Sequence, residues 1–112
     1  MRKVEIYILQ LNFKLIFSEG ILTFHSMSKP FFVSFPNGKI WINDNARSSL
    51  ATAGSGDLLC GIISGLISQE MDFENSLIAS VWIHGQLSQF KNNTTVEDFI
   101  KSIPNVFRQL KK

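Results

Sequence analysis

The chain has 112 residues, enough for one domain or one piece of a larger domain, and 45% of them are hydrophobic. Its formal net charge is +2 with acidic and basic residues mixed along the sequence, which argues against nucleic acid as the main partner. No run approaches the roughly 18 apolar residues of a membrane span, and polar residues interrupt the stretch after Met1-Arg2-Lys3 that a secretory signal would need. We therefore expect a cytoplasmic protein without a membrane partner.

The first third of the chain is rich in β-branched and aromatic residues, which favour strands. Short runs of this kind occupy residues 4–9, 13–17 and 21–25. Residues 31–35 and 40–42 then flank the sequence Pro36-Asn37-Gly38-Lys39, where proline presets one φ angle and Asn-Gly tolerates positive φ. This pattern predicts a β-hairpin over 31–43.

A glycine-rich turn follows the polar loop 43–49. Gly54 and Gly56 flank Ser55, which allows a sharp turn with outward N–H groups, and an apolar helix begins directly after it. Asp57 would lie in the first helical turn, where a carboxylate serves as a helix cap, a magnesium-side ligand or a general base. These four residues alone fit both an ordinary loop-to-helix cap and an anion-binding site.

Three helices are predicted after this turn, each with an apolar stripe. The first begins near Asp57, the second covers about 74–90, and the third is capped by Thr94 or Thr95 with acidic residues in its first turn. The stripes are Leu58, Leu59, Ile62, Ile63, Leu66 and Ile67; Leu77, Ile78, Val81, Trp82 and Gly85; and Phe99, Ile100, Ile103, Phe107 and Leu110. Gly61 and Gly65 would let another backbone approach the first helix, and Pro104 should kink or divide the third.

Strands followed by helices predict an α/β layer protein whose sheet lies mostly upstream, because the second half has no strand left to pair. The single cysteine, Cys60, is expected to be a buried, inert thiol in a reducing compartment. We expect His84 to be a structural histidine and Trp41 and Trp82 to belong to the core. No Cys/His cluster has the spacing of metal ligands, so no resident metal is expected.

Four segments between Asn43 and Gln69 form a recognisable pattern: Asn43, Leu50-Ala51-Thr52, Gly54-Ser55-Gly56-Asp57 and Gly61-Ile62-Ile63-Ser64-Gly65-Leu66. With His84-Gly85 and Ile103-Pro104, this pattern resembles the ADP/ATP-dependent NAD(P)H-hydrate dehydratases of the ribokinase-like superfamily. The resemblance covers about residues 12–110. It implies that 1–112 is a single partial domain, the C-terminal part of a ribokinase-like fold with strands and a β-hairpin followed by three helices.

The resemblance also implies a repair reaction, in which a nucleotide phosphorylates the ring hydroxyl of NADHX or NADPHX and phosphate then leaves. Asp57 would be the catalytic base and contact the substrate, while the amides of Gly54, Ser55 and Gly56 would cradle the transferred phosphoryl group. Gly56 would also contact the nucleotide. Asn43 would either contact the nucleotide or orient its loop. ADP or ATP would be the donor, and Mg²⁺ would arrive with it.

A second nucleotide-binding element of the family, Lys-Gly-x-x-Thr, matches Glu19-Gly20-Ile21-Leu22-Thr23. The resemblance implies nucleotide contacts for Gly20 and Thr23. Glu19 replaces the lysine, and its carboxylate would repel nucleotide phosphates.

Three functional hypotheses stay open at this point. The chain is an enzyme, completed by a second copy or by an N-terminal fragment. Alternatively, it is a non-catalytic remnant that binds a nucleotide or a partner, or a related ribokinase-like kinase of a small molecule.

Overall fold

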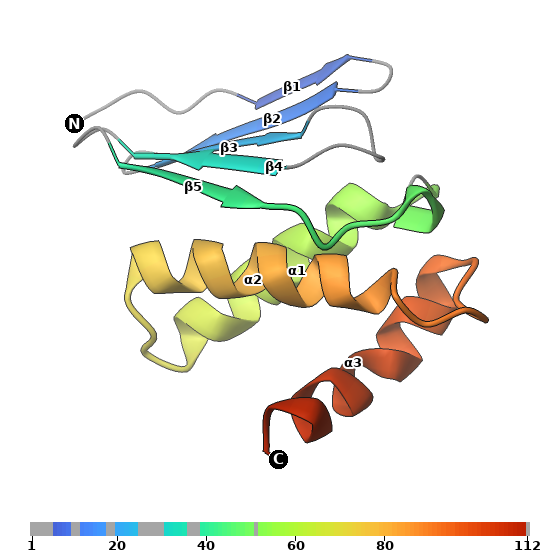
Figure 1. Cartoon of the computed structure of the whole chain (residues 1–112). Coiled ribbons are helices and arrows are strands. Elements are labelled where there is room, and N and C mark those ends of the chain that lie inside the picture. The colour runs from blue at the N-terminus through green and yellow to red at the C-terminus, as the bar shows by residue number, and fades with distance from the viewer. Residues whose placement is uncertain are drawn as a thin grey trace.

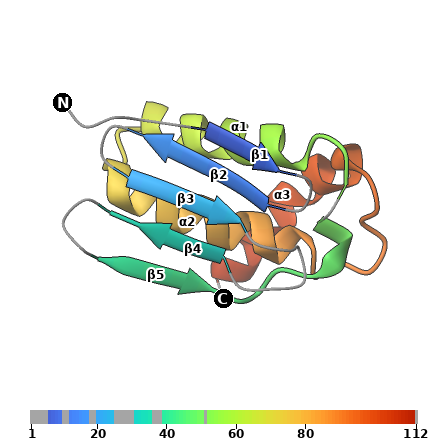
Figure 2. The ribbon, with the colours of Figure 1, turned by 90° about the horizontal axis from the view of Figure 1, so that it is seen from above.

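The computed structural model describes residues 6–9, 12–17, 20–24, 31–35, 39–50 and 52–111. Its described strands form one five-stranded sheet in the order β1-β2-β3-β4-β5, and every neighbouring pair is antiparallel (Figures 1 and 2). The strands are β1 (Ile6–Leu9), β2 (Asn12–Phe17), β3 (Gly20–Phe24), β4 (Phe31–Ser34) and β5 (Ile40–Asn43). All described strands precede all described helices, which agrees with the predicted order of elements.

The two strands predicted to flank the turn at 36–39 pair in the register Phe32↔Ile42 and Ser34↔Ile40. Phe35 N–H donates to the carbonyl of Lys39 at 2.9 Å, which continues the pairing beyond β4. The turn residues 36–38 and His25 lie outside the described residues.

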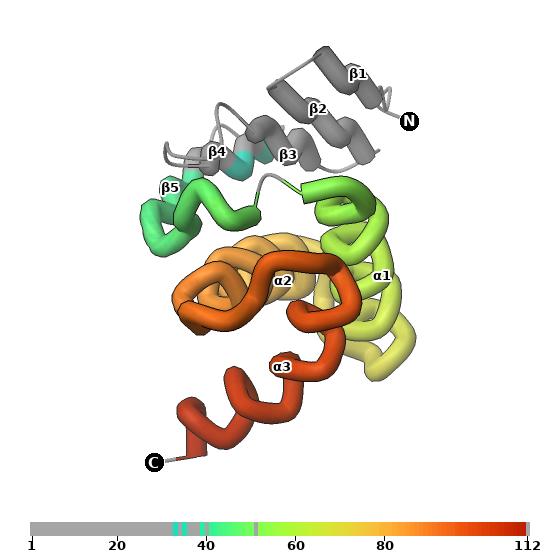
Figure 3. Tube along the Cα trace, turned by 90° about the vertical axis from the view of Figure 1, so that its right-hand side faces the viewer, coloured from blue at the N-terminus to red at the C-terminus, as the bar shows by residue number. Residues whose placement is uncertain are grey.

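Three helices follow a short 3-10 helix, η1 (Ser48–Leu50). They are α1 (Ser55–Ser68), α2 (Phe73–Leu87) and α3 (Val96–Leu110). Figure 1 shows α1 and α2 beneath the sheet, and Figure 3 shows these two helices side by side with α3 on their far side. None of the described helices is long and apolar enough to cross a membrane.

Helix α2 is the centre of the molecule, because it contacts α1, α3, β4 and β5. It is buried on more than one side, which explains why its hydrophobic residues form no narrow stripe. The core is made by Val33, Phe35, Leu50, Leu59, Ile63, Leu66, Leu77, Val81, Ile83, Leu87, Phe99 and Val106.

Local sequence chemistry fixes where α2 and α3 begin. The Asp72 side chain accepts a hydrogen bond from the N–H of Asn75 at the start of α2. Thr95 and Asp98 form a reciprocal capping box at the start of α3, as the predicted cap with acidic residues in the first turn requires.

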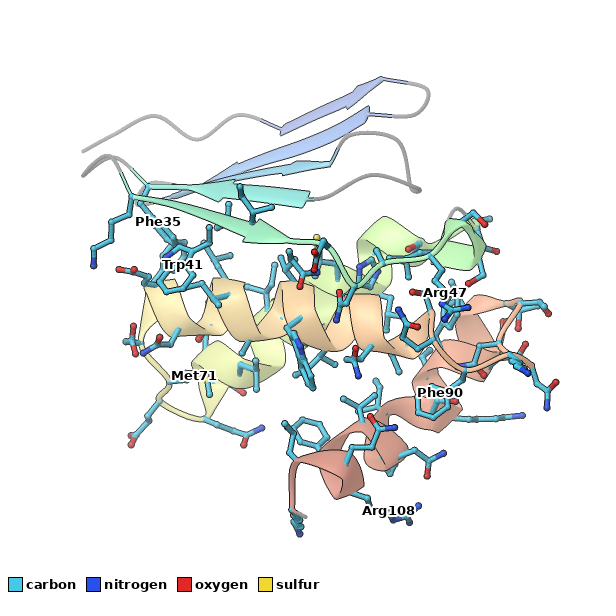
Figure 4. All side chains as sticks on the ribbon, in the orientation of Figure 1. Phe35, Trp41, Arg47, Met71, Phe90 and Arg108 are labelled. Carbon is cyan, nitrogen blue, oxygen red and sulfur yellow. The ribbon has the colours of Figure 1, made fainter. Side chains whose placement is uncertain are left out.

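Two expectations about packing were wrong, and a third was wrong in part. Helix α3 runs uninterrupted through Pro104, so this proline does not divide it, while the alternative of a kink stays a prediction. Trp41 is 47% exposed and donates to the Glu74 carboxylate at 3.4 Å instead of joining the core, and Figure 4 shows it between β5 and the start of α2. The predicted apolar stripes also include residues that the fold leaves exposed. Four of them are at least 40% exposed: Ile67, Ile100, Phe107 and Leu110.

Candidate functional site

The candidate site is the turn that joins η1 to α1. Leu50, at the end of η1, is fully buried and fixes the chain against the core just before the turn. Gly54 has a φ of 86°, a left-handed conformation that glycine adopts without steric cost. A Cβ atom at this position would lie 3.1 Å from Val96 Cγ2, so the turn packs closely on the first residue of α3.

Two amide groups are available at the start of α1. The N–H of Ser55 donates to the Thr52 carbonyl at 3.2 Å, and the N–H of Leu58 donates to the Gly54 carbonyl at 2.9 Å. Within the described part of the chain, the N–H groups of Gly56 and Asp57 have no hydrogen-bond acceptor. Together with the positive end of the helix dipole, they can bind an anion.

The Asp57 side chain is exposed in the first turn of α1, next to these two amides. It does not cap the helix, because the N-cap residue is Gly54 and no side chain caps this end. An exposed carboxylate beside free amide donors can accept a proton from a group that is bound there. The turn therefore brings two amide donors and an exposed carboxylate together at one place.

Ser55 is tied to helix α2 by His84. Both residues are buried, with exposed fractions of 3% and 0%. His84 Nε2 lies 2.9 Å from the Ser55 carbonyl oxygen and 3.0 Å from Ser55 Oγ. This contact agrees with the predicted structural role of His84, and it joins two residues that are 29 positions apart.

Burial lowers the pKa of His84 to about 4, and the hydrogen bond to the Ser55 carbonyl opposes this effect only in part. An unfolded chain takes up this proton near pH 6.5, whereas the folded chain excludes it until about pH 4. The contribution of neutral His84 to the free energy of unfolding should therefore be fully present above pH 6.5. It should fall by about 3 kcal/mol as the pH drops to 4. Urea unfolding at a series of pH values measures the slope. His84→Gln, which leaves His25 in place, should flatten it; an unchanged slope would refute the assignment.

The loop before η1 is held against α2 by two asparagines. Asn43 Nδ2 donates to Asn45 Oδ1 at 2.6 Å, and Asn45 Nδ2 donates to the Trp82 carbonyl and to Gln86 Oε1, both at 3.0 Å. A Cβ atom at Gly85 would lie 1.8 Å from Asn45 Oδ1. Gly85 is thus the place where the loop crosses directly over the backbone of α2. The observed contacts of Asn43 are those of a residue that orients its loop.

Further hydrogen bonds fix the rest of this loop to the end of α2. Arg47 donates from its backbone N–H to Ser88 Oγ at 2.8 Å and from Nε to Gln89 Oε1 at 2.7 Å, and Figure 4 shows its side chain over this part of the molecule. Thr52 Oγ1 donates to the Thr94 carbonyl at 3.4 Å. The turn is therefore supported by α2 and by the segment before α3, and its position does not depend on the loop alone.

Gly20 and Thr23, the other predicted nucleotide-binding residues, lie in strand β3, not in a loop. The pairing of β3 with β2 and β4 places Gly20 opposite Phe17 and Thr23 opposite Lys14 and Phe32. Glu19 is outside the described residues. The nucleotide contacts of this stretch stay a prediction.

Cys60 lies on α1, one turn after Asp57, and is half-buried against the core. Burial raises its thiol pKa, and the negative charge of Asp57 adds to this effect. We expect iodoacetamide to alkylate Cys60 at least about fivefold more slowly in the folded chain than in urea at the same pH. Equal rates in the two states would contradict an inert thiol.

Among the described residues, no group of three His, Cys, Asp or Glu side chains is placed to hold a metal ion. The turn contributes a single carboxylate, Asp57, which is too few protein ligands for a resident Mg²⁺ site.

Comparison with known proteins supports the family resemblance that the sequence pattern indicates. The sequence model of the NAD(P)H-hydrate dehydratases matches residues 29–105. Over 53 residues the chain is 42% identical to the ADP-dependent (S)-NAD(P)H-hydrate dehydratase of Neisseria meningitidis, and over 57 residues it is 32% identical to the enzyme of that name from Bacillus subtilis. It is 33% identical over 58 residues to the bifunctional NAD(P)H-hydrate repair enzyme Nnr of Gloeobacter violaceus.

These matches cover 47%, 51% and 52% of the chain but 18%, 21% and 11% of the three relatives, in the same order. The chain thus corresponds to a small part of each relative. No solved structure matches it with statistical significance.

Proposed function

Because the chain belongs to the NAD(P)H-hydrate dehydratase family, we propose that the turn from Gly54 to Asp57 is the phosphoryl-transfer corner of a nicotinamide-nucleotide repair enzyme. The observation that carries this proposal is the exposed Asp57 carboxylate beside the N–H groups of Gly56 and Asp57, which have no acceptor among the described residues. The reaction is the nucleotide-dependent dehydration of hydrated NADH or NADPH. The names of two relatives support ADP as the nucleotide.

In this proposal Asp57 takes the proton of the ring hydroxyl while the hydroxyl oxygen attacks the terminal phosphorus of ADP. The phosphoanhydride bond breaks and AMP leaves. The Gly56 and Asp57 amides hold an oxygen of the transferred group, whose negative charge they stabilise. The new phosphate ester then eliminates: the C–O bond to phosphate breaks, the neighbouring ring carbon loses a proton to solvent, and the C=C bond that forms restores the dihydronicotinamide ring.

The geometry favours Gly56 over Ser55 as an amide donor, because the Ser55 N–H already donates to the Thr52 carbonyl. Mg²⁺ would enter with the nucleotide phosphates, since the turn supplies one carboxylate. The fold assignment belongs to the same proposal: residues 1–112 form the C-terminal part of a ribokinase-like domain, whose remaining part would complete the substrate pocket.

The test is an assay of the purified chain with hydrated NADH, ADP or ATP, and Mg²⁺, alone and with a fragment that supplies the rest of the family fold. Release of NADH with one phosphate and one AMP per ADP consumed supports the proposal. Accumulation of a phosphorylated cofactor would indicate a kinase instead. Absence of turnover under both conditions would overturn the proposed activity and leave nucleotide or partner binding by a non-catalytic chain.

A further inference from the structure

The start of α1 lacks the stabilisation that the other two helices have. Asp72 caps α2 and Thr95 caps α3 through side-chain hydrogen bonds, whereas the N-cap residue of α1, Gly54, has no side chain to do so. Helix ends without a cap tend to fray. Beyond the backbone hydrogen bonds Ser55 N–H to Thr52 and Leu58 N–H to Gly54, a contact from another element can hold the first peptide groups of α1 in place.

His84 provides this contact, and its chemistry is defined by its partner. A carbonyl oxygen can only accept a hydrogen bond, so the 2.9 Å contact with the Ser55 carbonyl requires a proton on Nε2. The same N–H also faces Ser55 Oγ at 3.0 Å. The ring is fully buried and its pKa is lowered to about 4, so the neutral Nε2–H tautomer is the form present at neutral pH.

The Ser55 carbonyl and the Gly56 N–H belong to one planar trans peptide group, in which they point in opposite directions. A donor that fixes the carbonyl oxygen also fixes the direction of the N–H. In a helix this N–H points toward the N-terminal end, which here is the turn with Asp57. The contact made by His84 on the buried side thus determines the geometry on the exposed side.

We propose that His84 is a positioning residue for the candidate anion site: through the Ser55 carbonyl, its Nε2–H keeps the Gly56 N–H directed at the transferred phosphoryl group. This inference rests on the proposed function for the role of that amide, but the orientation itself exists without substrate. Removal of the ring donor should loosen the amide and lower kcat, because a misaligned amide stabilises the transition state less well.

Three variants separate this role from general packing. His84→Phe removes the donor and keeps a buried ring, whereas His84→Gln keeps an N–H donor at a similar distance along the side chain. Ser80→Ala is the matched control, since Ser80 lies one turn earlier on α2, is fully buried and has an Oγ without a hydrogen-bond partner among the described residues. It changes the interior of α2 without removing a hydrogen bond.

The primary measurement is the ¹⁵N order parameter of the Gly56 amide in the ligand-free protein. We expect about 0.85 in the wild type, Ser80→Ala and His84→Gln, and a value below about 0.6 in His84→Phe. In the assay above, His84→Phe should lower kcat about tenfold while the KM for the nucleotide changes less than about threefold. His84→Gln should restore most of kcat.

An unchanged Gly56 order parameter in folded His84→Phe would overturn the inference, as would an equal loss of kcat in His84→Gln. Should His84→Phe fail to fold, the ¹⁵N shifts of the wild-type ring decide: an Nδ1–H tautomer or a charged ring at neutral pH would overturn it, and a neutral Nε2–H ring supports it. Absence of turnover in the wild type, with the expected pattern of order parameters, would count against the proposed function alone.

Discussion

Asp57→Asn should lower kcat by at least about 100-fold, because it removes the proposed proton acceptor and keeps the shape of the side chain. The fold should persist, since Asp57 is exposed and caps no helix. We expect the free energy of unfolding to fall by less than about 1 kcal/mol, through the lost interaction of the carboxylate with the helix dipole. The dehydration assay measures kcat, and urea unfolding measures stability.

Glu97→Gln is the matched control for this prediction. Glu97 is an exposed acidic residue in the first turn of another helix, α3, and it takes no part in the capping box. The substitution Glu97→Gln should leave kcat within about twofold.

The thiol of Cys60 gives a readout that does not depend on activity, because the charge of Asp57 raises its pKa. Asp57→Asn should therefore speed its alkylation. A folded variant that retains wild-type kcat would exclude Asp57 as the base.

The sequence alone was sufficient to predict those elements that depend on residues close together in the chain. The predicted start of the third helix at Thr94 or Thr95, of which the structure shows Thr95 as the cap, rests on a hydroxyl, acidic residues in the first turn and the apolar residues that follow. All of these act within about one turn. The glycine-rich turn was predictable for the same reason. Gly54 takes the left-handed conformation that glycine permits, and α1 begins at the next residue.

Contacts between distant residues could not be predicted in the same way. The Asn-x-Asn spacing of Asn43 and Asn45 and the pair His84-Gly85 are visible in the sequence, but nothing local indicates that Asn45 lies on Gly85. His84 reaches Ser55 only because α1 and α2 pack side by side. The prediction that Trp41 belongs to the core was wrong because hydrophobicity predicts burial only on average. Its position on edge strand β5 leaves it 47% exposed.

Gly85→Ala should destabilise the fold more than Gly61→Ala or Gly65→Ala, the changes at two glycines inside α1. The new Cβ atom would lie 1.8 Å from Asn45 Oδ1, so the Asn45 side chain must leave its place. Its hydrogen bonds with Asn43, Trp82 and Gln86 are then lost, at about 1 kcal/mol each. Alanine regains about 1 kcal/mol of helix propensity. We expect a net loss of about 2 kcal/mol in urea unfolding.

Gly61→Ala is the opposite case, because no atom of the described part of the chain lies within 4 Å of a Cβ atom at Gly61 in the interior of α1. It should stabilise the fold by up to about 1 kcal/mol through helix propensity alone. A double-mutant cycle isolates the steric cause at Gly85. Asn45→Ala removes the obstacle and the same hydrogen bonds, so adding Gly85→Ala to it should stabilise the fold by about 1 kcal/mol through helix propensity. The resulting coupling free energy should be about 3 kcal/mol. Additive effects would show that Gly85→Ala acts through another contact, and that the loop before the candidate site does not depend on this glycine.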